Sequence, residues 1–115
     1  MTSRRFERVQ PITRATAAGI FDRAGPSEQA QALLSLAYHD PDWRWVQDRC
    51  LEKLANSSPE VRNMAALCLG HLARIHRSLE LERVLPVLTT LVDDPIVGPS
   101  ARDALDDIRL FLLRE

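Results

Sequence analysis

The sequence lacks features that several classes of protein require. Its 115 residues include only four glycines and few clusters of β-branched residues, which favours helices over a β-sheet. It contains no run of about 18 apolar residues, the length that a transmembrane helix needs. Its 15 basic and 16 acidic side chains nearly cancel, leaving a formal net charge of −1. A chain with so little net charge has no general attraction to nucleic acids or membranes.

The N-terminus and the two cysteines both indicate a reducing compartment. Charged Glu7 and Arg8 lie where a signal peptide would have an apolar segment. We therefore expect a cytoplasmic protein in which Cys50 and Cys68 are reduced and buried as small apolar residues. The length suits a single domain over residues 1–115, with an irregular segment at residues 1–12.

Motifs for catalysis and metal binding are also missing. The sequence has no G-x-S-x-G, no glycine-rich phosphate loop, no H-E-x-x-H and no C-x-x-C. His71 and His76 are five residues apart, which separates them by about 140° on a helix, so they do not form the same-face pair of a metal site. We therefore predict no enzymatic activity, no metal and no cofactor.

Two segments of the chain are versions of one another. One begins at Ser58-Pro59 and the other at Asp94-Pro95, and each joins a turn to a helical apolar stripe. The same offset of 36 residues relates Val61, Ala65, Leu69 and Leu72 to Val97, Ala101, Leu105 and Ile108. A fixed offset indicates a repeated helix-turn-helix unit. Such units stack into a solenoid because none buries its apolar face alone, and this architecture favours binding over catalysis.

Helix signals occur six times, which predicts an all-α fold, a short α-solenoid of about three antiparallel helix pairs. The clearest helix has Ser58 as its N-cap and Pro59 in its first turn, where no amide hydrogen is needed. Asp40 and Pro41 are expected to start the preceding helix in the same way. The predicted helices span about Thr13–Ala24, Pro26–Tyr38, Asp42–Ala55, Pro59–Ile75, Leu81–Leu91 and Pro99–Leu113.

Apolar periodicity predicts which side chains form the core. In the helix from Pro59 the inward stripe is Val61, Ala65, Cys68, Leu69, Leu72 and Ile75. Beside it, Ala66, Gly70 and Ala73 form a small-residue face that lets a neighbouring helix approach closely. The inward positions of the other helices include Cys50, Leu51, Leu54, Val84, Leu85, Leu88, Leu91, Val97, Ala101, Leu105 and Ile108.

The motif P-E-V-R-x-x-A-A-x-x-L-G-x-L at residues 59–72 resembles the second helix of a HEAT repeat. The Asp-Pro turns at 40–41 and 94–95 are also HEAT-like, and the resemblance covers about residues 26–112. The spacing of 36 is shorter than the usual HEAT period of about 40 to 47 residues and is similar to compact bacterial variants. Gly98 stands where the resemblance places an arginine, so any Arg-to-Asp ladder between repeats is expected to be incomplete.

The resemblance implies a binding surface on the second helices, which line the concave side of HEAT-like stacks. The offset of 36 places Leu67 beside Asp103, His71 beside Asp107 and Arg74 beside Leu110. The predicted patch consists of Leu67, His71, Arg74, Asp103, Asp106, Asp107 and Leu110. Its acidic residues would receive a basic partner and speed association. The alternative is a solvated helix face.

Trp45 is a separate candidate for partner contact, because tryptophan is enriched in binding hot spots. Half-buried packing against the helix at residues 26–38 is the alternative. We predict a protein–protein interaction module, most concretely an immunity or inhibitor protein that binds the basic surface of a toxin such as a nuclease. Small bacterial HEAT-like proteins are similar to known immunity proteins. A nucleic-acid binder and a helper subunit of an enzyme complex are the alternatives, and the acidic last helix argues against the first.

Overall fold

The computed structural model describes residues 9–113, which contain six helices and no strand. This confirms the all-α prediction, and every predicted helix boundary lies within two residues of the observed one. Residues 9–13 precede the first helix without regular structure, while residues 1–8 of the predicted N-terminal segment lie outside the described part. No described helix is both long and apolar enough to cross a bilayer. The helices are α2 (Arg14–Arg23), α3 (Pro26–His39), α4 (Trp43–Lys53), α5 (Pro59–His76), α6 (Leu81–Leu91) and α7 (Gly98–Phe111).

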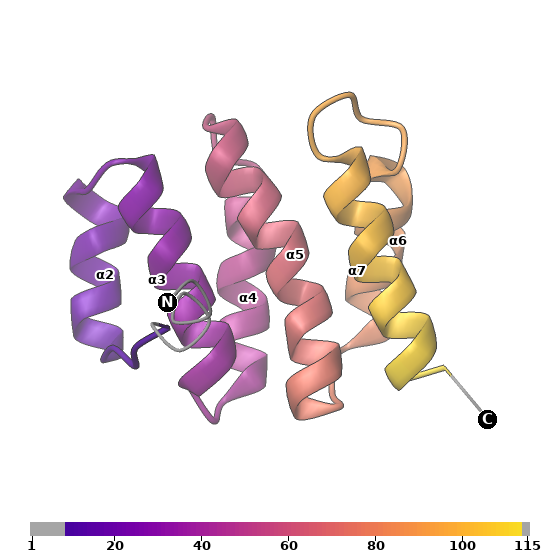
Figure 1. Cartoon of the computed structure of the whole chain (residues 1–115), viewed down its shortest axis with the longest axis horizontal. Coiled ribbons are helices and arrows are strands. Elements are labelled where there is room, and N and C mark those ends of the chain that lie inside the picture. The colour runs from indigo at the N-terminus through magenta and orange to yellow at the C-terminus, as the bar shows by residue number, and fades with distance from the viewer. Residues whose placement is uncertain (1–8, 114–115) are drawn as a thin grey trace, which may run out of the picture.

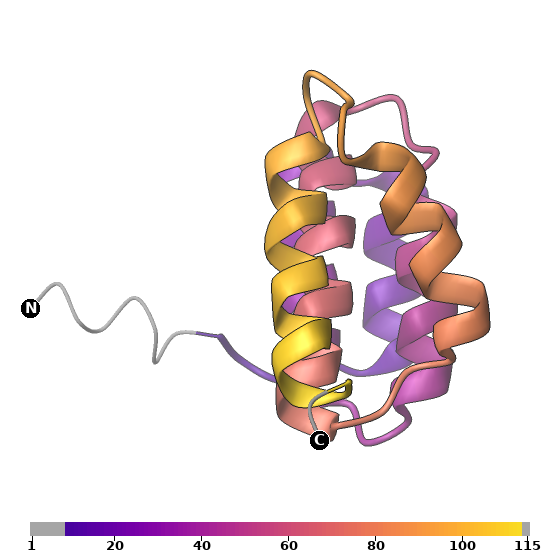
Figure 2. The same ribbon diagram turned by 90° about the vertical axis from the view of Figure 1, so that its right-hand side faces the viewer.

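The six helices form three consecutive pairs, α2–α3, α4–α5 and α6–α7, that stack side by side (Figure 1). The second helices of the pairs, α3, α5 and α7, run parallel in one layer, and α4 and α6 lie in a layer behind them (Figure 2). This arrangement is the predicted short solenoid, because each pair buries its apolar faces against its neighbours.

Helix α5 is the centre of the stack, and its sequence explains why. Ser58 caps it by accepting a hydrogen bond from the amide of Val61, and Pro59 occupies the first turn. Apolar and small residues on several sides of the helix are buried, so that α3, α4 and α7 all pack against it. The buried residues are Val61, Ala65, Ala66, Cys68, Leu69, Gly70, Leu72 and Ala73.

Five of the predicted core residues are not fully buried: Leu51, Ile75, Leu85, Leu91 and Leu105. Ile75 is 37% exposed because it lies in the last turn of α5. Leu105 is partly buried and faces a hollow together with Val92 and Arg102. Within residues 9–113 no helix beyond α7 covers this side, so the position that is buried as Leu69 in the middle repeat is partly open as Leu105 in α7.

The prediction that Asp40 and Pro41 start α4 is wrong. Asp42 is the N-cap, and its carboxylate accepts a hydrogen bond from the amide of Trp45. The Asp40 carboxylate instead accepts from the amide of Asp42 and from the guanidinium of Arg14. The tertiary contact with Arg14 in α2 thus gives Asp40 a role outside the cap.

Buried Gln47, which periodicity did not single out, joins α4 to the start of α6. Its amide nitrogen donates to Glu80 Oε1 at 2.7 Å, and its carbonyl oxygen accepts from the Glu80 amide at 2.7 Å. These bonds satisfy a polar side chain that burial would otherwise penalise. They also hold Glu80, the N-cap residue of α6, in place.

The resemblance implied an incomplete series of arginine–aspartate pairs between repeats, and the structure contains such a pair. Arg62 pairs with Asp94 of the next repeat at 3.3 Å. The Asp94 carboxylate also accepts from the amides of Ile96 and Val97 before α7 begins, and these bonds with Arg62 lower its pKa. At Gly98 a Cβ atom would lie 2.7 Å from the Val92 carbonyl oxygen. No arginine fits there, because the backbone of the preceding turn occupies its place.

Candidate binding surface

Helices α5 and α7 approach most closely at Gly70. A Cβ atom at this position would lie 3.0 Å from the Ala104 Cα and 2.9 Å from Asp107 Oδ2. About two turns nearer the start of α5, Ser100 of α7 donates a hydrogen bond to Asn63 at 2.8 Å. The predicted small-residue face of α5 therefore allows the close approach of a neighbouring helix that its composition indicated. It brings α7 against the α5 backbone and places the Asp107 carboxylate directly beside it.

Every predicted site residue except Trp45 lies on these two neighbouring helices. Their helical positions place them away from the buried stripes of α5 and α7, and all seven are exposed or only partly buried. Leu110 is the most open of the apolar members, at 50% exposure. The α5–α7 face is defined here as Leu67, His71 and Arg74 of α5 with Asp103, Asp107 and Leu110 of α7.

Asp107 has the most perturbed electrostatics of the acidic residues on the α5–α7 face. Partial burial raises the pKa of its carboxyl, and the nearby carboxylates of Asp103 and Asp106 add to that rise. Arg74 opposes the rise, and so it lies close to Asp107, but the two form no salt bridge. Arg74 therefore compensates part of the negative charge at this point without forming a direct ion pair.

His71 connects this face to α3. Its Nδ1 lies 2.9 Å from a guanidinium nitrogen of Arg74, and the ring of Tyr38 in α3 packs against it edge to face at 5.5 Å. Arg74 carries only donors, so His71 accepts this bond as a neutral imidazole. Burial and the positive charge of Arg74 lower the pKa of His71 to about 4. The imidazole is consequently uncharged at neutral pH and orients Arg74.

Asp106 is turned toward the end of the solenoid, away from the Gly70 contact. It pairs with Arg109 at 2.8 Å and lines the hollow that also contains Leu105. This member of the predicted patch therefore lies at the margin of the α5–α7 face. At about 100° per residue, Asp106 lies about 100° around the helix from Asp107 but only about 60° from Asp103, which places it at the edge of the face.

Trp45 lies on α4, in the other layer of the solenoid. Its ring is partly buried, with the guanidinium of Arg14 at 4.3 Å and that of Arg49 at 5.1 Å from the ring centroid. Trp45 is therefore partly buried, and its ring contacts Arg14 and Arg49. The two cations cover the indole, which leaves little of its aromatic face for a partner.

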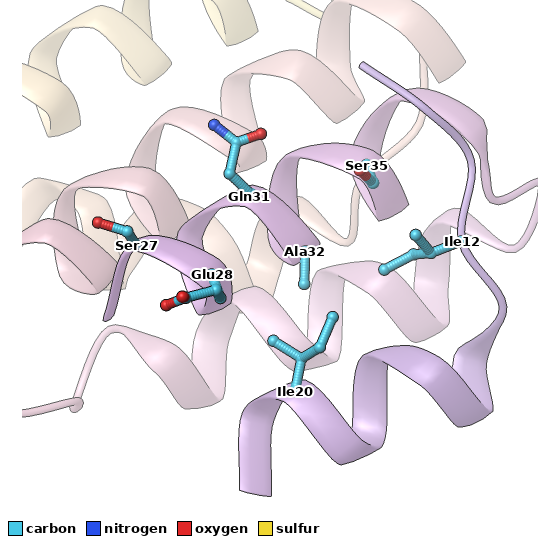
Figure 3. A pocket seen from close by; sticks show the side chains of 7 residues that line it. All are labelled: Ile12, Ile20, Ser27, Glu28, Gln31, Ala32 and Ser35. Atoms are coloured by element: carbon cyan, nitrogen blue, oxygen red, sulfur yellow. The ribbon is translucent and has the colours of Figure 1, made fainter. Parts of the chain in front are cut away.

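An apolar hollow of about 310 Å³ lies between α2 and α3, at the end of the stack opposite α7 (Figure 3). Ile12 and Ile20 approach Ala32 across it, and Glu28 and Gln31 lie along its rim. Sequence analysis did not identify this hollow. The available signal was that α2 buries only Ala17, which leaves its remaining apolar residues at the surface.

The two cysteines are free and buried, as predicted. Burial raises the pKa of the Cys68 thiol, which keeps it protonated and unreactive at neutral pH. Within residues 9–113, no three His, Cys, Asp or Glu side chains are grouped to hold a metal ion.

The comparison with known proteins agrees with the fold. The model of the HEAT repeat matches residues 46–76, which span most of α4 and all of α5. No curated protein matches the chain. A chain in the crystal structure of a CDI complex from Cupriavidus taiwanensis LMG 19424 is 34% identical to this one, with a TM-score of 0.82. The match covers 91% of this chain and 93% of that chain. The protein therefore belongs to the same family of HEAT-repeat proteins as this component of the Cupriavidus complex.

Proposed function

We propose that this protein is an immunity protein of a contact-dependent inhibition system, which binds a cognate toxin and neutralises it. The observation that carries the proposal is the 34% identity to a chain of a CDI complex over nearly the full length of both chains. The HEAT repeat adds support, because stacked helical repeats serve mainly as extended binding surfaces. An inhibitor of this kind acts in the cytoplasm by covering its target, and it needs no catalytic group.

The surface proposed to bind the toxin is the α5–α7 face. It combines a partly exposed apolar centre with charged residues around it, the composition of many protein interfaces. Asp106 adds negative charge at the margin of the face. Its acidic side chains favour a toxin with a basic surface, as a nuclease has where it contacts the phosphates of its substrate.

The lack of a salt bridge at Asp103 and Asp107 is the specific support for this choice. Neither carboxylate forms a salt bridge with any residue of the described part. Like charges held close together repel one another, and a basic side chain of the toxin would relieve that repulsion. Such complementarity accelerates association more than it strengthens the final complex.

A growth assay tests the proposed function. A candidate toxin domain, identified by searching the genes adjacent to the gene of this chain, is expressed in a host cell, with and without the protein. We expect co-expression to restore growth and the purified pair to form a stable complex. An unrelated toxin of similar charge is the control, and growth should not recover with it. Failure of the chain to bind or protect against its neighbouring toxin contradicts the proposal.

A further inference from the structure

Arg77 adopts a backbone conformation that glycine normally occupies. It is the C-cap of α5, with φ 55° and ψ 33°, and it is the one non-glycine residue with positive φ in the described chain. Its amide donates to the Ala73 carbonyl, which closes the helix. Helices commonly end with glycine at such a left-handed position, because a side chain strains the backbone there. The backbone conformation at this position is therefore less favourable for arginine than for glycine.

The side chain of Arg77 is held in a defined position. Its guanidinium lies over the ring of Phe111, the last residue of α7, 5.1 Å from the ring centroid. The preceding residue, His76, is fixed to α3 by a 3.2 Å contact between its Nε2 and the Ala37 carbonyl oxygen. A guanidinium stacked on an aromatic ring keeps its N–H edge free to bind a carboxylate in a bidentate manner.

The location of Arg77 links it to the α5–α7 face. It follows Arg74 by three residues in the same helix, while Leu110 is the neighbour of Phe111 in α7. Arg77 is exposed, Leu110 is 50% exposed, and Arg77 forms no salt bridge with another described residue. The face therefore has negative charge at Asp103 and Asp107 and positive charge at the end where α5 and α7 terminate.

Resting on the proposed function, we infer that Arg77 is a toxin-contacting residue that receives an aspartate or glutamate carboxylate of the toxin beside Leu110. Charge complementarity selects a carboxylate, since the guanidinium is exposed and forms no salt bridge with another residue of the described part. A pre-positioned arginine loses little conformational freedom on binding, and arginine is enriched among the residues that dominate interfaces. The negative charge at Asp103 and Asp107 and the positive charge at Arg77 also define the orientation of the toxin. Its basic groups lie over the two aspartates, and an acidic group lies over Arg77.

The test compares binding and melting of Arg77→Gly in the full chain. Glycine removes the guanidinium and relaxes the left-handed backbone. We expect a melting temperature at or above that of the wild type, together with dissociation from the neighbouring toxin domain about tenfold faster. Arg77→Asn, which also tolerates this conformation, should weaken binding to a similar extent. Arg109→Ala is the matched control, because it removes a positive charge from the last turn of α7 outside the α5–α7 face, and it should leave dissociation unchanged.

The outcomes separate this inference from the function on which it rests. Fast dissociation of both Arg77 variants, measured well below their melting temperatures, supports the contact. Dissociation within about twofold of the wild type for Arg77→Gly and Arg77→Asn overturns it, even if reversal of Asp103 and Asp107 weakens the complex. Absence of any binding by the wild-type chain contradicts the proposed function itself.

Discussion

The surface of α4 and the α5–α7 face differ in how their charges are satisfied. Every charged side chain of α4 has a partner within the described chain. Arg44 pairs with Glu80, Asp48 with Arg83, Arg49 with Glu52, and Lys53 lies over the ring of Phe21. On the α5–α7 face, Asp103 and Asp107 form no salt bridge with a residue of the described part, and Arg74 forms a side-chain hydrogen bond with neutral His71.

This difference helps to distinguish a solvated helix face from a binding surface. A solenoid exposes charge on both layers, and net charge alone does not separate them. Paired charges on α4 contribute little to association, because each partner already screens the other. Unpaired charges on the α5–α7 face project a field that a complementary protein can use. The contrast leads to predictions that we order from the largest expected effect to the smallest.

The core beneath the face should be far more sensitive than the face itself. Leu69 is fully buried in α5, so Leu69→Ala should lower the free energy of unfolding by about 2 to 5 kcal/mol by opening a cavity. Leu110→Ala is the matched control on the α5–α7 face, and its effect should stay within about 0.5 kcal/mol. Urea denaturation of both variants provides the measurement. Equal losses in the two variants would show that Leu110 is a core residue.

The contact at Gly70 should connect stability to the shape of the face. A Cβ there meets the backbone of Ala104, so Gly70→Ala should destabilise the protein by about 1 to 3 kcal/mol and displace Asp107. In α2, a Cβ at Gly19 meets only the end of the Arg23 side chain, 3.2 Å away. Gly19→Ala should therefore stabilise by about 0.5 to 1 kcal/mol through helix propensity. Thermal melting of both variants checks the contrast, and a stabilising Gly70→Ala would refute the close helix contact.

Removal of the exposed apolar side chain on the face should act on the lifetime of the complex. We expect Leu110→Ala to speed dissociation from the toxin by about fivefold, with little change in the association rate. Ile96→Ala is the control, because Ile96 is similarly exposed at 44% but lies in the loop before α7. Surface plasmon resonance distinguishes the two rates. Faster dissociation for Ile96→Ala than for Leu110→Ala would place the apolar contact at the loops.

The last prediction concerns how the free energy of unfolding depends on pH through His71. Because its native pKa is about 4, below the ordinary value of about 6.5, the unfolded chain binds a proton more readily than the native protein. The stability that neutral His71 provides is therefore complete above about pH 6.5 and is lost as the pH falls toward 4. His71→Gln should flatten this decline, measured as the free energy of unfolding at several pH values. An unchanged slope would show that His71 protonates freely in the native state.

The fold was predictable because its signals are local. Ser58 and Pro59 define the start of α5, and apolar stripes at a constant offset of 36 identify the repeat and the pairing of α5 with α7. Leu105 was misjudged for the opposite reason, since no local pattern reveals which side of a helix its neighbours leave uncovered. The choice between Asp40 and Asp42 as the cap likewise depends on distant Arg14.

The candidate face was predictable in its membership but not in its chemistry. The offset placed His71 near Asp107, yet the neutral state of His71 follows from burial and from Arg74, which only the packed structure brings together. The left-handed backbone of Arg77 and its stacking on Phe111 were also invisible in the sequence, because they depend on where α5 and α7 end.

The central claim is that unpaired charge on the α5–α7 face steers the toxin, and one pair of variants tests it directly. The measurement is the toxin association rate at low and high salt for Asp103→Lys with Asp107→Lys, compared with Asp48→Lys with Glu52→Lys on α4. Both double variants change the net charge equally. We predict that the first slows association at low salt by about tenfold or more and weakens its salt dependence, whereas the second stays within about twofold of the wild type. Equal slowing by both variants, or no slowing by the first, would contradict the claim.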